Sequence, residues 1–327
     1  MNILVAIYSP FPSWCIPDAQ VEHLRREFPE HTFTRADSDA EMLARIVDTD
    51  VLYGARLNRS HLAAARRLRW IHSPAAGVGN MLFPDMVASP VILSNSRGNS
   101  AVTIAEHVLA VTLALLRQLP LAWQRQTERV WAQNEFNAGA RIRSLRGARV
   151  LVVGLGSIGG AAARLASACG AHVVGIRRRT AGPPPPGVAA VVPPSRLHDE
   201  LALADVVVLS APQTPETMHL IGATELALMK ADAVLVNVSR GKLIDEAALA
   251  KVLQTGRLRG AALDVFEHEP LSPDSPLWAR DDVLITPHVS GFHANYWPAA
   301  AAMFADNLRR FVAGQPLANL VDKQAGY

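Results

Sequence analysis

The sequence has 327 residues, of which 50% are hydrophobic and 19% are charged. This is an ordinary globular composition, and the length suffices for two domains with a core each. The formal net charge of +3 is far from the concentrated positive charge of a nucleic-acid-binding protein, so we expect no nucleic-acid partner. The two cysteines lie far apart without a metal-ligand spacing, which fits a reducing compartment and argues against a disulfide framework or a bound metal.

The N-terminal segment MNILVAIYSPFPSW lacks the basic region and the small-residue cleavage site of a signal peptide. Its apolar run is too short to span a bilayer. We therefore expect a cytoplasmic chain without a membrane partner, in which this run is a buried strand.

Apolar runs that read as strands alternate with helical patterns through the first hundred residues, which predicts an α/β fold with a parallel sheet. The predicted strands cover 2–8, 31–35, 50–53, 69–72 and 91–94, and helical patterns include 17–28 and 38–47. Ser38 and Glu41 have the spacing of a capping box for the second of these helices.

A long apolar helix is predicted over 100–118, with Ser100 as its N-cap. The pattern then becomes polar and irregular over 121–146, which predicts an arm. A second α/β series follows, with strands at 149–153, 172–176, 206–209, 233–237, 260–263 and 283–285. The chain closes with a helix over 298–313 that ends at Gly314.

The stretch ARVLVVGLGSIGGAAARLASACG places three glycines between a strand and a helix. In this Rossmann-type frame Gly154 permits a tight turn, Gly156 lets the backbone approach a pyrophosphate, and Gly159 allows close packing of helix and strand. The helix N-terminus then offers N–H groups to the phosphates. A glycine-rich turn without a ligand is the alternative.

The next strand of such a unit normally ends in an acid that binds the adenine ribose. Here the strand AHVVGI is followed by Arg177, with Arg178 and Arg179 next. A guanidinium can pair with a 2′-phosphate, which a carboxylate would repel, so the substitution predicts NADP with NAD as the weaker alternative. Arg178 is a second candidate contact, although both arginines after Arg177 could be solvated loop residues.

Three later strand ends carry groups suited to reducing a 2-keto acid. VLVNVSRGKLID presents Arg240, GAALDVFEHEPL presents Glu269, and VLITPHVSG presents His288. In an open α/β sheet the ligand crevice lies outside the carboxyl ends of the strands, where all three meet. A cation can hold the substrate's carboxylate, while an imidazolium kept charged and oriented by a carboxylate gives a proton to the carbonyl oxygen. Each residue taken singly has a structural alternative.

These motifs, together with WIHSPAAGVGN, SNSRGNSAVTIAEHVLA and VVLSAPQTPETMHLIG, resemble the D-isomer-specific 2-hydroxyacid dehydrogenase family over nearly the whole chain. The resemblance implies that Arg240 binds the substrate, that Glu269 pairs with the acid/base His288, and that backbone amides of Ala76 and Gly77 hold the substrate carboxylate. It also implies further cofactor contacts, from Thr103, Ser157, Ile158, Ala211, Pro212, Thr217, Val238, Ser239, Asp264 and Gly291.

The resemblance further implies a discontinuous flavodoxin-like substrate (lid) domain, formed by residues 1–97 and 291–327. The Rossmann doubly wound parallel-sheet domain would cover 98–290, with a homodimer arm near 120–146. Gly79 stands where the family often has Asp, which leaves the substrate-side loop open. Arg177 replaces the acid of NAD-using members, and similar relatives include NADPH-linked glyoxylate/hydroxypyruvate reductases. Specificity is expected from the loops near 52–56, 75–80 and 292–297.

Two other interpretations remain open. A sibling enzyme could act on another donor, such as phosphite or formate. Formate-specific members carry Gln where this chain has Glu269, and they have an extra N-terminal segment, so formate is disfavoured. A dinucleotide-sensing, corepressor-like interaction protein on the same fold can keep the catalytic residues, but neither a long disordered tail nor a basic patch is present in the sequence.

Overall fold

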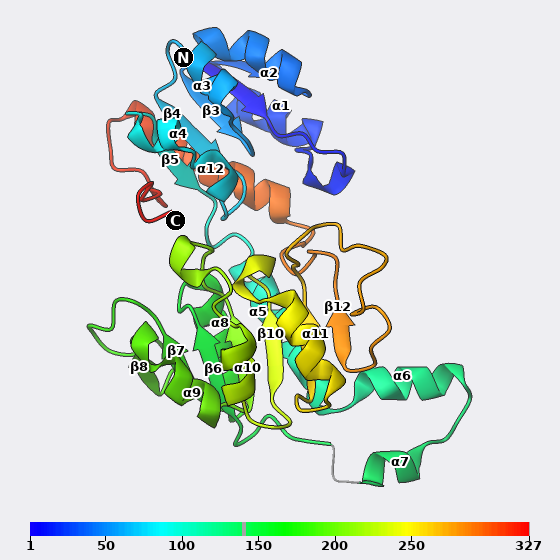
Figure 1. Cartoon of the computed structure of the whole chain (residues 1–327). Coiled ribbons are helices and arrows are strands. Elements are labelled where there is room, and N and C mark those ends of the chain that lie inside the picture. Colours follow the sequence, from blue (N-terminus) through cyan, green and yellow to red (C-terminus); the bar gives the residue numbers. More distant parts are fainter. Residues whose placement is uncertain (139–141, 327) are drawn as a thin grey trace. The chain divides into compact units, whose positions relative to one another are not determined.

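A computed structural model describes residues 1–138 and 142–326 and divides the chain into two compact units. Unit 1 comprises Met1–Asn99 and the chain from His293 onward, and unit 2 comprises Ser100–Phe292 (Figure 1). The boundaries expected from the sequence, after residues 97 and 290, lie two residues before these. Of the expected arm at 120–146, residues 139–141 lie outside the described residues.

Within the described part of unit 1, parallel strands form a five-stranded sheet in the order β2-β1-β3-β4-β5. The strands are β1 (Asn2–Ala6), β2 (Thr32–Arg35), β3 (Val51–Gly54), β4 (Trp70–Ser73) and β5 (Ile92–Asn95). This is the flavodoxin-like order. The predicted strands are confirmed to within two residues, because strands buried on both faces appear in the sequence as short, nearly continuous apolar runs.

Helices cover both faces of this sheet. They are α1 (Asp18–Glu27), α2 (Asp39–Arg45), α3 (Arg59–Ala64), α4 (Pro84–Ala88) and α12 (Tyr296–Val312). Alternate residues of β1 divide between two cores: Ile3 and Val5 pack with α1 and α12, whereas Leu4 and Ala6 pack with α2 and α4. The C-terminal helix is therefore part of the first unit, which makes that unit discontinuous in sequence.

The chain after α12 returns along the edge of this sheet. Asn95 N donates to Asn319 O and Val321 N donates to Leu93 O, so the tail pairs antiparallel with β5. Lys323 Nζ donates to three carbonyls at the end of α4 and in the segment after it, at 2.6–3.1 Å. The tail thus covers an edge strand that would otherwise offer unpaired backbone groups.

Unit 2 contains, among its described residues, a seven-stranded parallel sheet in the order β12-β11-β10-β9-β6-β7-β8. The strands are β6 (Arg149–Val153), β7 (His172–Ile176), β8 (Ala190–Val192), β9 (Val206–Leu209), β10 (Val234–Asn237), β11 (Gly260–Leu263) and β12 (Val283–Ile285). From β8 to β11 the strands follow the Rossmann order, and β12 extends it. All predicted strands are confirmed, and β8 is an addition that the sequence prediction missed.

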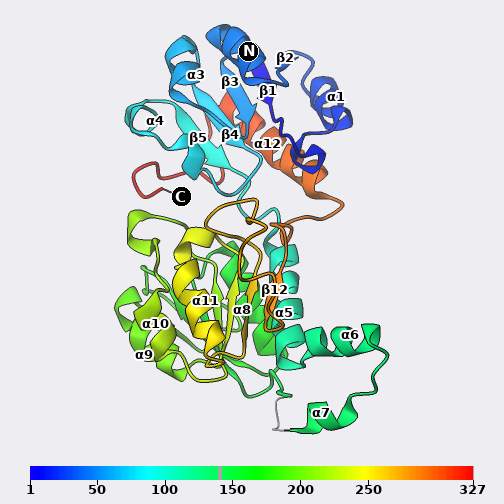
Figure 2. The same cartoon turned by 45° about the vertical axis from the view of Figure 1, so that its right-hand side comes forward.

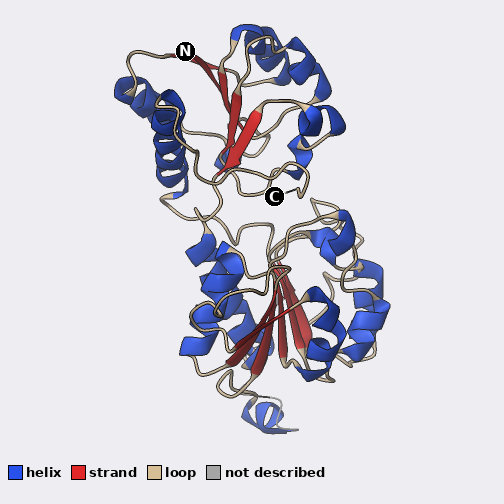
Figure 3. Cartoon of the chain, turned by 90° about the vertical axis from the view of Figure 1, so that its left-hand side faces the viewer, coloured by secondary structure: helices blue, strands red, loops and turns tan. Residues whose placement is uncertain are grey.

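Helices also flank both faces of this sheet, as Figure 3 shows. They are α5 (Ala101–Leu116), α8 (Ser157–Ala168), α9 (Leu197–Leu203), α10 (Ala223–Leu228) and α11 (Glu246–Gln254). Val150 and Val152 of β6 pack with α5 and α8, whereas Leu151 and Val153 pack on the side of α9, α10 and α11. Short 3-10 helices include η3 (Gly79–Met81), η6 (Pro215–Thr217) and η7 (Gly241–Leu243).

Two helices of unit 2 project away from its sheet, α6 (Leu119–Thr127) and α7 (Gln133–Asn137) (Figures 1 and 2). Trp131, between them, is 91% exposed, and Trp123 and Val130 are each more than half exposed. Among the described residues no single helix is long and apolar enough to cross a membrane, although α5 and α6, bent by 68° at their break, pass that test as a pair.

Of two predicted helix N-termini, the capping box at Ser38 needs correction, and the position of Ser100 as N-cap is confirmed. Ser38 Oγ accepts from Glu41 N as expected, but the Glu41 carboxylate accepts from Asp37 N, one residue before the N-cap, so no reciprocal box forms. Ser100 does occupy the N-cap of α5, but its side chain makes no capping hydrogen bond. Gly314, at φ 66°, follows the C-cap of α12 in the left-handed conformation that favours glycine.

Candidate active site

The sheet order of unit 2 brings the predicted site residues to one edge. Because all strands are parallel, the residues after β7, β6, β9, β10, β11 and β12 lie at the same end of adjacent strands. Arg177 follows β7, the glycine loop follows β6, and the catalytic candidates follow β10, β11 and β12. Three strand spacings, about 14 Å, separate the end of β7 from the end of β10. The predicted cofactor and catalytic positions thus run in order along this edge.

The glycines of the loop after β6 meet three different geometric demands. Gly154 has φ 99°, and a Cβ there would lie 2.5 Å from Ala211 N. A Cβ on Gly159 would lie 2.0 Å from Gly154 O, so α8 could not approach β6 as it does. A Cβ on Gly156, the N-cap of α8, would meet nothing within 4 Å. The space beside Gly156 is therefore open to a ligand, at a helix N-terminus that favours anions.

Arg177 lies directly after β7 and is only partly exposed. Its Nη2 donates to Ala181 O at 3.4 Å, and its buried Nε has no hydrogen-bond partner in the part of the chain that the structure describes. Arg178 is exposed and contributes to lowering the pKa of Glu216, after the hydrogen bonds from Thr214 and the backbone. The open space at Gly156, at the N-terminus of α8, fits the pyrophosphate of a dinucleotide.

His288 and Glu269 form a pair. Their side chains meet at 2.7 Å between Nδ1 and Oε2, and both are more than a third exposed. Burial alone would raise the pKa of Glu269, but hydrogen bonds from His288 and from Phe266 N, with the charges of His288 and Arg240, hold it below its ordinary value. Glu269 is thus a charged carboxylate at neutral pH, and its contact with Nδ1 orients the ring of His288.

Arg240 follows β10 and starts the turn that leads into η7. Its Nη1 donates to Ser239 O at 2.6 Å, and Asn237 Nδ2 fixes the Arg240 carbonyl at 3.0 Å. No salt bridge to Arg240 occurs among the described residues, although Glu269 is near enough for its pKa to respond to the Arg240 charge. The residue as a whole is exposed, yet the surroundings of its guanidinium are buried enough to lower the pKa of Arg240, and the charge of Glu269 opposes this. A guanidinium that keeps its charge in such surroundings can receive an anionic group.

Asp264, predicted as a cofactor contact, anchors the segment that carries His288. Its side chain is 1% exposed, and its carboxylate accepts from Thr286 Oγ1 at 2.6 Å, Val289 N at 2.9 Å and Ser290 N at 3.1 Å. His288 has φ 54°, a left-handed conformation that costs a non-glycine residue about 1 kcal/mol or more. The bonds to Asp264 stabilise that conformation, while the cofactor contact stays a prediction.

His107 of α5 belongs to the same network, and the sequence analysis missed it. Its Nε2 lies 3.3 Å from Thr286 Oγ1. Since Thr286 donates its proton to Asp264, it accepts from His107, which fixes a proton on Nε2 of that ring. Burial lowers the pKa of His107, and the charge of Asp264 opposes this. His107 and Thr286 lie 179 positions apart, so no local sequence pattern could have predicted their contact.

The other predicted cofactor residues link neighbouring segments of the same edge. Ser239 Oγ donates to Ala211 O, Thr217 Oγ1 donates to Pro212 O at 2.7 Å, and Thr103 Oγ1 donates to Ser100 O at 3.3 Å. Ser157 and Ile158 begin α8, Val238 directly follows β10, and Gly291 lies in the segment after β12. Their cofactor roles stay predictions. No cluster of three or more metal-binding side chains occurs in residues 1–138 and 142–326.

Ala76 and Gly77 lie in unit 1, in the loop after β4, and Gly79 begins η3. The structure therefore brings Arg240, Glu269 and His288 together in unit 2 and holds the amide loop in unit 1. Tyr296, in one of the expected specificity loops, is 9% exposed and donates its hydroxyl to Pro74 O at 3.0 Å. Burial raises its pKa to about 12.

Residues 109–290 match the family model described as D-isomer specific 2-hydroxyacid dehydrogenase, NAD binding domain. The chain belongs to this family. A glyoxylate reductase of Korarchaeum cryptofilum is 31% identical to this dehydrogenase family member over 319 residues, covering 91% of this chain and 95% of the relative. D-3-phosphoglycerate dehydrogenases match as well. That of Methanocaldococcus jannaschii is 33% identical over 289 residues, which cover 86% of this chain and 53% of the relative. The chain thus spans about half the length of these curated relatives.

Two solved structures of family members are similar over the whole chain. A D-isomer-specific 2-hydroxyacid dehydrogenase of Xanthobacter autotrophicus, in complex with NADPH and MES, has 31% identity and a TM-score of 0.85, with 99% of each chain covered. An NADPH-dependent glyoxylate/hydroxypyruvate reductase of Sinorhizobium meliloti, in complex with NADP and sulfate, has 26% identity and a TM-score of 0.85, with 100% of each chain covered. The chain is thus a family oxidoreductase with an NAD(P)-binding domain.

Proposed function

We propose that this dehydrogenase is an NADPH-dependent reductase of small 2-keto acids, with glyoxylate and hydroxypyruvate as substrates and the D-isomer as product wherever the 2-hydroxy acid is chiral. The observation that carries the proposal is the His288–Glu269 pair at 2.7 Å beside Arg240, which has no salt bridge among the described residues. A proton donor and a cation beside one another suit a substrate that carries a carbonyl next to a carboxylate.

In the proposed reaction the nicotinamide cofactor, when bound, supplies a hydride to the carbonyl carbon. Arg240 binds the carboxylate and the carbonyl oxygen, which fixes the keto acid and stabilises the negative charge that develops on that oxygen. His288 donates the proton from Nε2 to the oxygen. Glu269 accepts from Nδ1, which orients the ring and attracts the positive charge that the ring carries as an acid.

The preference for NADPH is proposed from Arg177 at the end of β7. A guanidinium there can pair with a 2′-phosphate, and its Nε is buried without a partner among the described residues. The relatives of X. autotrophicus and S. meliloti, whose structures hold NADPH and NADP, support the same preference.

A substrate panel tests the reaction. The purified chain is assayed with NADPH and with NADH against glyoxylate, hydroxypyruvate, pyruvate and 3-phosphohydroxypyruvate, the last because of the phosphoglycerate dehydrogenase relatives. We expect turnover of the two small keto acids, and His288→Ala should lower kcat by about 100-fold or more while the dissociation constant of NADPH stays within about twofold. Tight NADPH binding without turnover of any keto acid would favour the sensor interpretation instead.

We also propose a homodimer formed through the projecting segment that carries α6 and α7. Trp131 is 91% exposed and Trp123 is 54% exposed on this segment. Exposed large aromatic side chains gathered on one projection are typical of a protein–protein contact rather than of a monomer's surface.

A further inference from the structure

The loop of unit 1 that carries Ala76 and Gly77 is held through the carbonyls of the four residues that precede Gly77. Four successive carbonyls each accept a hydrogen bond from outside the segment 73–76. The bonds run from Ser96 Oγ to Ser73 O at 3.0 Å, from Tyr296 Oη to Pro74 O at 3.0 Å, from Ser96 N to Ala75 O at 3.4 Å and from Asn95 Nδ2 to Ala76 O at 2.7 Å. Among the described residues, neither Ala76 N nor Gly77 N donates to a partner. The loop thus has its acceptors engaged and two donors available.

Buried side chains form a hydrogen-bond chain that leads to the bond between Ser96 Oγ and Ser73 O. Trp70 Nε1 lies 2.9 Å from Ser94 Oγ, which lies 2.8 Å from His72 Nδ1. His72 Nε2 lies 3.1 Å from Ser96 Oγ. The five residues that this hydrogen-bond chain links are at most 1% exposed: Trp70, Ser94, His72, Ser96 and Ser73. The chain connects β4 with β5 and the residue after it.

The direction of every proton in this chain can be derived. Ser96 donates to the Ser73 carbonyl, so its oxygen accepts from His72 Nε2–H. His72 is a neutral imidazole, because burial lowers its pKa to about 3, so its Nδ1 accepts from Ser94. Ser94 in turn accepts from the indole of Trp70, which is a donor only. The chain therefore runs from Trp70 to the loop in one direction, and it fixes the Nε2–H tautomer of His72.

We infer that this hydrogen-bond chain, with Tyr296 and Asn95, positions the loop so that the amides of Ala76 and Gly77 are presented to the substrate's carboxylate. The inference rests on the proposed function, and on the role that the family resemblance implies for those amides, which is to hold the carboxylate of the keto acid. Tyr296 and Asn95 are positioning residues, since they act through the loop carbonyls. In a trans peptide the C=O of one residue and the N–H of the next lie in one plane and point in opposite directions. The bonds to Ala75 O and Ala76 O therefore fix the N–H groups of Ala76 and Gly77, and the bonds to Ser73 O and Pro74 O hold the segment that leads into them.

The alternative is that these residues only complete a core. Rings of Tyr53, Trp70 and Phe304 surround His72 at 5.7–5.9 Å between centroids, so a satisfied core histidine would also fit. A purely structural role would lower stability when the residues are changed. It would not raise the KM for the keto acid selectively, which separates the two.

Two isosteric variants make the test. Tyr296→Phe removes the hydroxyl from Pro74 O, and Asn95→Asp puts an oxygen against Ala76 O while keeping the acceptor for Arg97 N. Asn319→Asp is the matched control, since that side-chain amide donates to Arg97 O, at 2.9 Å, outside the loop. For each protein, KM and kcat for glyoxylate, the dissociation constant of NADPH and the unfolding midpoint are measured.

The expected result is a KM for glyoxylate about five- to tenfold higher in Tyr296→Phe and higher still in Asn95→Asp, with NADPH binding unchanged and Asn319→Asp like the wild type. An unchanged KM in folded Tyr296→Phe and Asn95→Asp would overturn the inference. So would an equal loss of NADPH affinity. If the wild type reduces no keto acid, the proposed function fails, and the hydrogen-bond chain is judged by the next measurement alone.

That measurement is the tautomer of His72, read from ¹⁵N-histidine NMR of the wild-type chain and assigned by the signal missing in His72→Gln. The chain predicts a neutral ring with the proton on Nε2 down to pH 5. A proton on Nδ1, or an imidazolium at that pH, would refute the direction of the chain whatever the activity.

Discussion

Replacing Gly156 by alanine should separate folding from cofactor binding. Gly156 has φ −82° and ψ −159°, which alanine adopts without strain, and its Cβ would meet nothing within 4 Å. Alanine is a poorer N-cap than glycine, but it also reduces the freedom of the unfolded chain, so the two effects oppose each other. We expect the free energy of unfolding of Gly156→Ala to stay within about 1 kcal/mol of the wild type.

The dinucleotide should bind much more weakly to this variant. The added methyl group would occupy the open space through which the pyrophosphate approaches the N-terminus of α8. Losing one charge-assisted hydrogen bond costs about 1.5–3 kcal/mol, which corresponds to a dissociation constant about 10- to 100-fold higher. Fluorescence titration with NADPH measures the affinity, and urea denaturation without cofactor measures the stability.

Two neighbouring glycines give matched controls. Gly160→Ala adds a methyl group in the same helix with nothing within 4 Å, so it should bind NADPH normally and gain up to about 1 kcal/mol of stability. Gly159→Ala would place its Cβ 2.0 Å from Gly154 O, so it should lose about 1–3 kcal/mol before any cofactor is added. Wild-type NADPH affinity in Gly156→Ala would refute the assignment of this loop.

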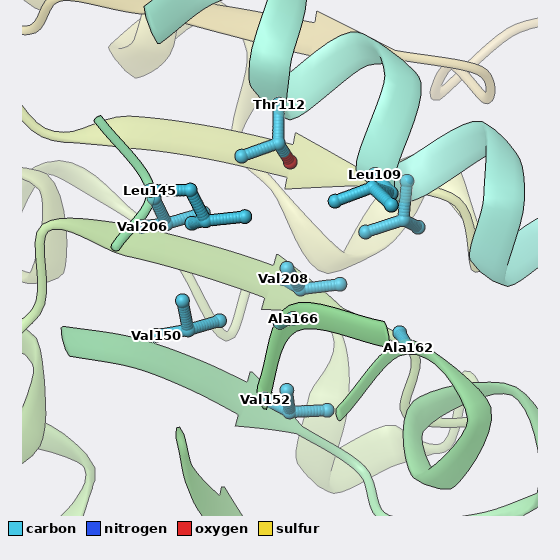
Figure 4. A pocket seen from close by; sticks show the side chains of 10 residues that line it. Leu109, Thr112, Leu145, Val150, Val152, Ala162, Ala166, Val206 and Val208 are labelled. Carbon is cyan, nitrogen blue, oxygen red and sulfur yellow. The ribbon is translucent and has the colours of Figure 1, made fainter. Parts of the chain in front are cut away.

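Three further outcomes are expected. The Thr112 hydroxyl lies buried without a partner among the described residues, against the small apolar cavity between α5, α8 and the sheet (Figure 4). Thr112→Val should therefore raise the free energy of unfolding, measured by urea denaturation, by about 1 kcal/mol. A decrease would count against this account of the cavity. Burial lowers the pKa of His72 from 6.5 to about 3, so between these pH values the unfolded chain binds a proton that the folded chain does not. The free energy of unfolding should therefore fall by up to about 1.4 kcal/mol per unit of decreasing pH in this range. In His72→Gln the free energy of unfolding should depend less on pH, and the same pH dependence in variant and wild type would contradict this. Trp131→Ser should convert a dimer to monomers in sedimentation velocity, and an unchanged assembly would remove the arm from the interface.

Most of the fold could be predicted because buried parallel strands appear in the sequence as apolar runs. The strands Arg149–Val153 and His172–Ile176 were predicted residue for residue, since their valine- and isoleucine-rich runs stop at Gly154 and at Arg177. The strand Ala190–Val192 was missed, because three residues between proline-rich segments carry no distinct pattern. The helices α6 and α7 lay within a stretch that looked irregular, since neither has a buried residue and hence neither shows an apolar face.

Site residues could be predicted from the sequence only where the position of a residue type within a motif determines its role. The roles of Gly154 and Gly159 follow from positions in a strand–loop–helix frame, and the structure bears out the turn at Gly154, with φ 99°, and the close packing at Gly159. The pairing of His288 with Glu269 was expected from family motifs and is present at 2.7 Å. The anchoring of the 73–77 loop by Tyr296 joins residues 222 positions apart, and no local pattern encodes such a contact.

The central claim is an NADPH-dependent reduction, and the ratio of kcat/KM for NADPH to that for NADH, with glyoxylate as substrate, tests it most directly. The ratio should exceed about tenfold in the wild type, fall by about 10- to 100-fold in Arg177→Asp, and stay near the wild-type value in Arg179→Asp, whose side chain is fully in the exposed loop. Equal efficiency with the two cofactors, a preference of the wild type for NADH, or an unchanged ratio in Arg177→Asp would contradict the assignment of this arginine to the 2′-phosphate.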